Sequence, residues 1–341
     1  MSLSDYIIKD MNKIRREDVL ITPSLYSLLL YMLLNRNWEK SDYVLHNRIP
    51  KLIQSNLEKW VTNVYVDNVK AKDNTFCDKI LQNFKYWKYL RYSKNVEYDN
   101  VYGNDEFYLS MKYRNQGMKI IEDGPYFNDE KILRKRRTKL YVGLLNYWFY
   151  WSYKDYVPWG FDKHVTTYYH TEVNKLPAEI AHKGVLIDIH QLWKAKSEEE
   201  KKRIMHVFGI NPIVVDTLRK YKTILVTQIL PLSNAEKIEM YKSMLSENGV
   251  RESELLIKTH YAETIDYRQV FPDACVIDTP VPAQLLDVLG YEADMAMTIC
   301  SSAIFSFAKK KTKIIFKGTE FDEHLKNFYG VIRLEDFKLY E

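Results

Sequence analysis

The chain has 341 residues, of which 46% are apolar, and it carries a formal net charge of +5 at pH 7. This length is sufficient for two domains, and this apolar content excludes a wholly disordered chain. The positive charge is weak and its basic residues are dispersed, so we expect no nucleic-acid partner.

The cysteines and the hydropathy of the chain indicate in which cellular compartment the protein is expected. The three cysteines form no C-x-x-C pair, which fits a reducing cytoplasm and argues against a structural zinc site. The first residues are charged and lack the apolar core of a signal peptide. No apolar run reaches the roughly 18 residues of a transmembrane helix. We therefore expect a cytoplasmic protein, or one held peripherally at the inner face of the membrane.

The first part of the chain alternates short apolar runs with helical spacing, a pattern typical of βαβ units and a parallel sheet. Strands are predicted at residues 19–22, 42–45, 61–66, 100–102, 118–121, 165–170 and 185–189. Helices are predicted at residues 24–34, 49–59, 75–92, 106–113, 128–151 and 197–207. Ser197 and Glu200 form a capping-box pattern at the start of the last of these helices.

A second alternating set begins after the Gly-Ile-Asn-Pro sequence at 209–212, which we take as the domain boundary. Its predicted strands are 223–228, 255–258, 275–278, 295–300 and 312–316, and its predicted helices are 235–246 and 283–289. We therefore predict an α/β protein of GT-B-like architecture, with two Rossmann-like domains facing each other across a ligand-binding cleft. The domains are residues 1–211 and 212–341, and packing of the extreme C-terminus on the first domain stays open.

Three short polar motifs each follow an apolar run that we predict to be a strand. They are Glu-Asp-Gly at 122–124, Lys-Thr-His at 258–260 and Ser-Ser at 301–302. Ligand sites of α/β folds lie beyond the carboxyl ends of the strands. A carboxylate there can act as a general base, a Lys/His pair can supply a cation and an acid to a leaving phosphate, and hydroxyls can donate to its oxygens.

Each motif also has a purely structural interpretation. Asp-Gly is common turn chemistry, and the Lys-Thr-His sequence would suit a solvated strand end. The two serines would suit a helix cap. Taken singly, each motif favours the structural interpretation, and the case for a site rests on their order and shared context.

Other motifs limit the chemistry. There is no P-loop, no G-x-G-x-x-G, no G-x-S-x-G elbow and no D-x-D, the nearest being Glu292-Ala-Asp294. We therefore expect a reaction without metal or cofactor. Residues 131–139 are basic and 147–156 are rich in Trp and Tyr. A solvated helix face is the default there, and the alternative is a peripheral contact of 131–156 with a membrane or a lipid-linked glycan.

The order acidic-acidic-Gly, then K-x-H, then paired hydroxyls resembles the bacterial sialyltransferases, and most closely glycosyltransferase family 52, the lipooligosaccharide sialyltransferase family. The resemblance spans about residues 19–316, but its specific matches are these three motifs. It implies a GT-B fold with an acceptor-side first domain and a nucleotide-sugar-binding second domain. It also implies inverting, metal-independent transfer from CMP-sialic acid to a galactose-type acceptor on a bacterial surface glycan, in lipooligosaccharide or capsule biosynthesis.

The resemblance carries roles onto the matching residues. Asp123 matches the acidic residue linked to deprotonation of the acceptor, and His260 matches the histidine near the CMP phosphate. Ser301 and Ser302 match the phosphate-binding hydroxyls, and Lys258 is the first residue of the same K-x-H motif. The predicted catalytic residues are therefore Asp123 and His260.

This sequence departs from the family pattern at two positions. Tyr261 stands where the family usually has Pro, and Gln284 stands where an acidic residue often contacts the nucleotide ribose. Gln284 can still bind a hydroxyl, although more weakly than a carboxylate. In addition, Glu236 or Glu239, in a predicted 234–239 loop, is an alternative base to Asp123.

Two other functions stay open. One is transfer from a different nucleotide sugar, such as a UDP-hexose, whose diphosphate would need more cationic help or a metal. The other is a non-catalytic glycan-binding or membrane-binding module that uses the 131–156 segment. The expected partners are a nucleotide sugar and a glycan acceptor, free or lipid-linked, and the oligomeric state, a homodimer included, stays open.

Overall fold

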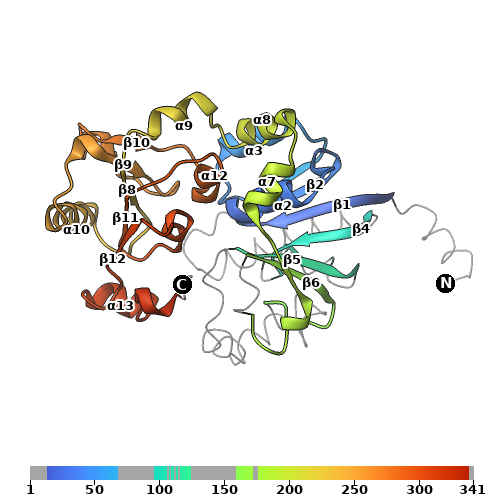
Figure 1. The fold of residues 1–341 in the computed structure, drawn as a ribbon. Helices are drawn as coiled ribbons and strands as arrows, with labels where there is room; N and C mark the ends of the chain where they lie inside the picture. Colours follow the sequence, from blue (N-terminus) through green and yellow to red (C-terminus); the bar gives the residue numbers. More distant parts are fainter. Residues whose placement is uncertain are drawn as a thin grey trace, which may run out of the picture. The chain divides into compact units, whose positions relative to one another are not determined.

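The chain divides into two compact units, Met1–Lys196 and Ser197–Glu341, coloured from blue to green and from yellow to red in Figure 1. A computed structural model describes residues 14–67, 96–105, 107, 109–110, 113, 116–123, 159–171 and 176–337. The helices predicted at 75–92 and 128–151 lie outside the described residues.

The boundary between the units differs in place from the one expected after residue 211. The Gly-Ile-Asn-Pro sequence instead separates helix α8 (Glu198–Val207) from helix α9 (Pro212–Leu218), both of which belong to the second unit. Gly209 has a φ of 66°, and the Asn211 side chain accepts a hydrogen bond from the Ile213 N–H at 3.0 Å. The Gly-Ile-Asn-Pro sequence therefore marks the end of one helix and the cap of the next.

The described part of the first unit forms a seven-stranded sheet in which every pairing is parallel. The strands are β1 (Ile14–Thr22), β2 (Asp42–His46), β3 (Val64–Asp67), β4 (Val96–Gly103), β5 (Met118–Ile121), β6 (Val165–His170) and β7 (Gly184–Leu186). Their order is β3-β2-β1-β4-β5-β6-β7, which begins with the 3-2-1-4 arrangement of Rossmann domains. The switch point of this sheet therefore lies between β1 and β4.

Among the residues of the first unit that the structure describes, several helices accompany the sheet. They are α2 (Leu25–Leu34), α3 (Lys51–Leu57) and α7 (Ile189–Ala195), with short 3-10 turns η1 (Trp38–Lys40) and η7 (Ala181–Lys183). Helix α2 is buried over almost its whole length, as the run of leucines predicts, and Ser24 caps its first turn by accepting from the N–H groups of Tyr26 and Ser27. This cap fixes α2 directly after the carboxyl end of β1.

The strands β1 and β4 approach closely at the switch point. Gly103 has a φ of 139°, and a Cβ atom at this position would lie 1.9 Å from the carbonyl oxygen of Ile21. Glycine is therefore required here by the close contact as well as by the backbone angle. Next to it, the Asn104 N–H donates to the same carbonyl at 3.1 Å.

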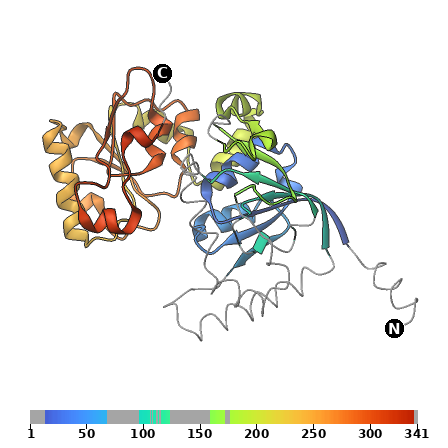
Figure 2. The ribbon, with the colours of Figure 1, turned by 90° about the horizontal axis from the view of Figure 1, so that it is seen from below.

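The second unit repeats the arrangement with five parallel strands among its described residues (Figure 2). The strands are β8 (Thr223–Val226), β9 (Leu255–Lys258), β10 (Cys275–Ile277), β11 (Met295–Thr298) and β12 (Lys313–Phe316). Besides α8 and α9, the helices are α10 (Asn234–Glu247), α11 (Tyr267–Val270), α12 (Ala283–Val288) and α13 (Glu323–Tyr329), with 3-10 turns η8 (Glu252–Glu254), η9 (Ser302–Phe307) and η10 (Leu334–Asp336). The order β10-β9-β8-β11-β12 is again 3-2-1-4-5. Two Rossmann-like units are therefore confirmed.

Candidate active site

The three predicted motifs lie at the carboxyl edges of the two sheets. Glu122 and Asp123 directly follow β5 in the first unit, and Gly124 lies outside the described residues. Lys258 ends β9 in the second unit, and Ser301 follows β11. Each unit therefore presents its own group of polar side chains.

Asp123 is a partly buried carboxylate with a raised pKa. Burial raises the pKa of Asp123 to about 6, the negative charge of Glu122 adds to the rise, and Ser24 and Arg48 act in the opposite direction. A carboxylate whose pKa is near the working pH combines basicity with the correct charge state. Asp123 is therefore suited to accept a proton from a substrate hydroxyl.

Glu122, the residue before Asp123, lies in a polar cluster that is largely buried. Its carboxylate forms an ion-pair contact with His170, with 3.2 Å between Oε2 and Nε2, and both side chains have 0% exposure. The hydroxyls of Tyr26 and Thr171 donate to Oε1 at 2.7 and 2.6 Å. We call these four residues the Glu122 cluster. It joins the loop after β5 to α2 and to the end of β6.

Side chains from the switch point hold the backbone that bears Asp123. The Ser27 hydroxyl donates to the carbonyl oxygen of Glu122 at 2.7 Å. The Asn104 amide donates to the carbonyl oxygen of Ile121 at 2.9 Å, and its own oxygen accepts from Thr22 at 2.6 Å. The start of the turn is therefore fixed by β1, β4 and α2 together.

A second buried carboxylate, Asp105, lies near this turn. It accepts the backbone N–H groups of Trp159 and Gly160 at 2.9 and 2.8 Å. Burial raises the pKa of Asp105 to about 6. Trp159 has a φ of 70°, so the two hydrogen bonds hold a strained turn. Asp105, Trp159 and Asp123 line the same narrow hollow.

Lys258 and His260 lie at the carboxyl end of β9 in the second unit. The Lys258 ammonium is buried and donates to the carbonyl oxygen of Thr259 at 2.7 Å. Burial lowers the pKa of Lys258 to about 8, although Asp278 opposes the shift. Burial and the nearby Lys258 charge lower the pKa of His260 to about 4. His260 is therefore neutral at pH 7 without a ligand, and an anionic ligand would raise its pKa.

A buried hydrogen-bond relay holds the loop that carries His260. The His260 N–H donates to the Thr227 hydroxyl at 3.0 Å, and that hydroxyl donates to the Glu263 carboxylate. Tyr267 also donates to Glu263, at 3.1 Å, and Lys237 of α10 lies 3.5 Å from its other oxygen. These contacts connect the ends of β8 and β9 to α10 and α11.

The serines follow β11, which is separated from β9 by β8 in the sheet. Adjacent strands lie about 4.8 Å apart, so the ends of β9 and β11 are roughly 10 Å apart. The Ser301 N–H donates to the Thr298 hydroxyl at 3.2 Å. Ser301 precedes η9 without making a side-chain cap hydrogen bond, and both serine side chains are partly exposed. Their hydroxyls therefore face no competing role as helix caps.

The remaining predicted residues lie on helices. Gln284 is in the first turn of α12, which packs against η9 and so against the serine segment. Glu236 and Glu239 are exposed on α10, which corrects the expected 234–239 loop, because Ser233 and Glu236 form a capping box there. Hydrogen bonds from Ser233 lower the pKa of Glu236 and make it a weaker base than Asp123.

Sequence reasoning missed several residues of these groups. The most deeply placed are Tyr26, His170, Thr227 and Glu263. His170 is the last residue of β6, and Thr227 directly follows β8. The strand-end rule that identified Asp123 would have found both. Glu263 lies in a loop, where the sequence carries no comparable signal.

The described residues bear on two of the expectations. Within them, no group of three or more His, Cys, Asp or Glu side chains is placed to hold a metal ion. The metal-independent reaction stays a prediction. No helix in the described parts of the chain is both long and apolar enough to span a bilayer. The expected membrane contact at 131–156 lies outside the described residues.

Comparison with known proteins gives one family and one fold. The sequence profile of glycosyltransferase family 52 matches residues 51–320. An uncharacterized protein of Haemophilus influenzae is 31% identical over 253 residues, which are 72% of this chain and 77% of that protein.

Solved structures of bacterial sialyltransferases share the fold. The GT-B domain of the Photobacterium damselae enzyme aligns with a TM-score of 0.53 and 14% identity, over 89% of this chain and 90% of that one. The 2,6-sialyltransferase of Photobacterium sp. JT-ISH-224, solved with CMP and lactose, aligns with a TM-score of 0.56 and 12% identity, over 88% and 71% of the two chains. The fold is therefore GT-B.

Proposed function

This chain belongs to glycosyltransferase family 52 and is a glycosyltransferase, and we propose that it transfers sialic acid from CMP-sialic acid to a galactose-type hydroxyl with inversion. The acceptor belongs to a bacterial surface glycan such as lipooligosaccharide or capsule. The observation that carries the proposal is Asp123, a carboxylate beyond β5 whose pKa is raised to about 6. Sialyltransferases of the same fold support the choice of donor.

Asp123 acts as the general base in this proposal. It takes the proton of the acceptor hydroxyl while that oxygen attacks the anomeric carbon of the donor. The bond from the anomeric carbon to the phosphate oxygen breaks, and CMP leaves with the electron pair. Attack from the face opposite to CMP inverts the configuration.

The second unit holds the departing phosphate. Lys258 supplies a positive charge, and its pKa of about 8 leaves most of the lysine protonated at pH 7. The negative phosphate of the bound donor raises the pKa of His260, so the imidazole takes up a proton from solvent, and the imidazolium donates it to the departing phosphate. Ser301 and Ser302 donate hydrogen bonds to the phosphate oxygens. Gln284 contacts the nucleotide ribose.

Titration calorimetry of the purified protein with CMP tests this assignment, with UDP as the comparison and EDTA present throughout. We expect CMP to bind and His260→Ala to weaken it by about tenfold or more, since charge-assisted hydrogen bonds are worth roughly 1.5–3 kcal/mol. His182→Ala, at an exposed position in the first unit, is the matched control. Binding of UDP alone would instead indicate a UDP-hexose donor, and binding of neither nucleotide would indicate a non-catalytic glycan-binding module.

A further inference from the structure

A cavity of about 210 Å³ opens at the amino edge of the sheet in the first unit. Its lining includes Arg16 near the start of β1, and Asp42, Val64 and Val96, which are the first residues of β2, β3 and β4. Asp123 follows the opposite, carboxyl edge of the same sheet. Arg16 and Thr22 are six residue steps apart along β1, a length of about 20 Å at the usual strand rise. A single sugar ring in this cavity therefore cannot contact Asp123.

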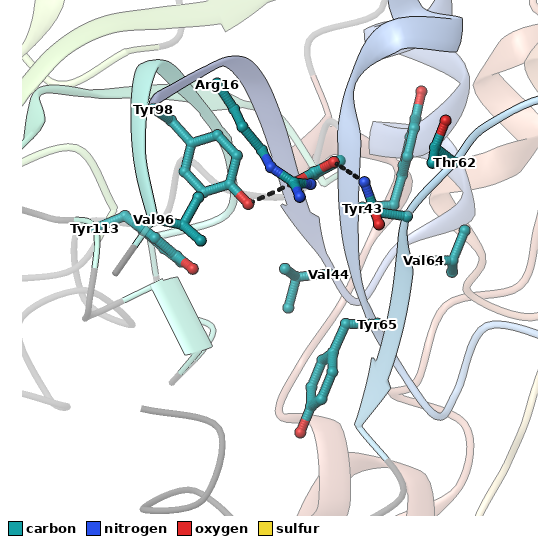
Figure 3. A pocket seen from close by; sticks show the side chains of 11 residues that line it. Arg16, Tyr43, Val44, Thr62, Val64, Tyr65, Val96, Tyr98 and Tyr113 are labelled. Atoms are coloured by element: carbon teal, nitrogen blue, oxygen red, sulfur yellow. Dashed lines mark hydrogen bonds and ion pairs between the residues drawn. The ribbon is translucent and has the colours of Figure 1, made fainter. Parts of the chain in front are cut away.

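Aromatic rings and valines form the walls and floor of the cavity. Figure 3 shows the side chains of Tyr65, Tyr98 and Tyr113 around Val44. Tyr98 and Tyr113 meet edge to face, with 5.3 Å between ring centroids and 74° between planes, so they form a rigid corner. Such walls suit a ring with apolar C–H faces, because tyrosines offer contact area with little loss of conformational freedom.

The polar side of the cavity has no net charge. Arg16 forms an ion pair with Asp42 at 2.5 Å, which neutralises both groups. Tyr98 and Asn63 also donate to the Asp42 carboxylate, at 2.7 and 2.9 Å. A phosphate or carboxylate ligand needs an uncompensated cation, so this arrangement disfavours an anion.

Several hydrogen-bond acceptors at the cavity keep capacity for a ligand. The carboxylate of Asp42 has about four lone-pair sites, of which three are used. The carboxamide oxygen of Asn63 and the hydroxyl of Thr62 have no partner among the described residues and line the same cavity. The phenol oxygen of Tyr98 can also accept a hydrogen bond. A ligand with several hydroxyl donors and no charge matches this set.

We propose that this cavity binds the ring of one neutral hexose, as a glycan-binding site separate from the residues of transfer. Its volume is below the roughly 300–1,000 Å³ of sites for larger ligands, so one ring enters and the rest of a glycan extends into solvent. The proposal does not depend on the donor or on the reaction. It predicts that the chain recognises glycans through a neutral sugar as well as through the transfer site.

Titration of the full chain with methyl galactoside and methyl glucoside, without nucleotide and followed by saturation-transfer NMR, tests the proposal. We expect saturable binding with a millimolar Kd for at least one of them. Tyr65→Ala, which removes one wall, should weaken it by about tenfold. Phe328→Ala removes an exposed aromatic ring of the second unit and should leave the Kd unchanged.

A second variant distinguishes loss of the sugar site from loss of the fold. Thr62 is exposed at the cavity, so Thr62→Trp adds a ring at the surface and should block the sugar while the circular dichroism spectrum stays that of the wild type. Absence of saturable binding would overturn the proposal, and so would binding that survives both Tyr65→Ala and Thr62→Trp. Binding lost in Asp123→Asn but kept in Tyr65→Ala would also overturn it, because the sugar would then occupy the transfer site. Since no nucleotide is present, none of these outcomes depends on whether transfer occurs.

Discussion

At the scale of single residues, the two proposed catalytic groups have pKa values displaced in opposite directions. Burial raises the pKa of Asp123 to about 6 and lowers that of His260 to about 4. In both cases burial penalises the charged form. The carboxylate consequently becomes a stronger base, and the imidazole stays neutral until a phosphate arrives. At neutral pH without ligand, Asp123 is therefore largely ready to accept a proton, whereas His260 is neutral and takes up its proton when the donor phosphate binds.

Removing the base tests the role of Asp123. Asp123→Asn should lower turnover by on the order of 100-fold or more, because general-base catalysis contributes that much, while CMP affinity stays unchanged. In the wild type, turnover should rise with pH through about 6, since Asp123 must lose its proton to act. Initial rates across pH measure both effects, with Asp273→Asn as the control on an exposed position. A comparable loss in Glu236→Gln, with Asp123→Asn still active, would transfer the role to Glu236.

The charge of Glu122 should tune this pH dependence. Because that charge contributes to the raised pKa of Asp123, Glu122→Gln should shift the acid limb of the rate profile to lower pH. The amide keeps the shape of the side chain and can still accept from Tyr26. The rate profile is measured below the melting temperature of the variant, so that loss of fold is not mistaken for loss of base. An acid limb that stays in place would mean that Glu122 has a structural role alone.

At the scale of elements, the strands were predicted well where they are buried and poorly where they carry charge. The buried run 19–22 was predicted, but β1 begins at Ile14. Residues 15–18 are charged and exposed or partly exposed, and two of them pair across strands, Arg15 with Asp99 of β4 and Arg16 with Asp42 of β2. A sequence shows the charge of these residues but not the partner that makes them compatible with a sheet.

The carboxyl ends of the buried strands identified the candidate site residues. Buried parallel strands end abruptly in polar residues, so Asp123, Lys258 and Ser301 could be found from the sequence. The relay beneath His260 could not, because Thr227 and Glu263 are 36 residues apart and meet only when β8 and β9 pair. Helix α9 was also missed, since a seven-residue helix gives little periodicity.

The relay should contribute to stability as well as to binding. Thr227→Val removes the acceptor of the His260 N–H and one donor to Glu263, so the free energy of unfolding should fall by about 1–3 kcal/mol. The control Thr217→Val removes a helix-surface hydroxyl that donates to the carbonyl oxygen of Ile213. It should change the free energy of unfolding by less than about 0.5 kcal/mol. Urea denaturation measures both variants. Equal losses of unfolding free energy in the two variants would show that the relay does not stabilise the fold.

At the scale of the whole molecule, both units use the same strand order around a switch point. In the first unit Gly103 permits the close approach of β1 and β4, and in the second Thr298 of β11 bonds the carbonyl oxygen of Val226 at 2.8 Å. The architecture of two such units followed from the alternation of apolar runs and helical spacing. The boundary did not follow, because a helix cap and a domain linker use the same residues.

Binding of a ligand or a metal changes the stability of the whole chain. CMP at 100 times its Kd should stabilise the folded state by about 2.7 kcal/mol and raise the melting temperature accordingly. The increase should be the same with and without EDTA, should persist in Asp123→Asn and should shrink in His260→Ala. Loss of the increase, or of turnover, on adding EDTA would contradict metal independence.

The parallel pairing of both sheets has a consequence for how fast the protein can fold. Ile14 pairs with Val96, and Thr223 pairs with Met295, so the central strand pairs of both sheets close only after long stretches of chain have been made. Chains dominated by such distant pairings fold slowly and leave unpaired strand edges exposed meanwhile. We therefore expect the yield of soluble protein to improve when synthesis is slowed by low temperature or when chaperones are supplied in excess. This kinetic burden comes from the same topology that brings polar residues together at one edge of each sheet.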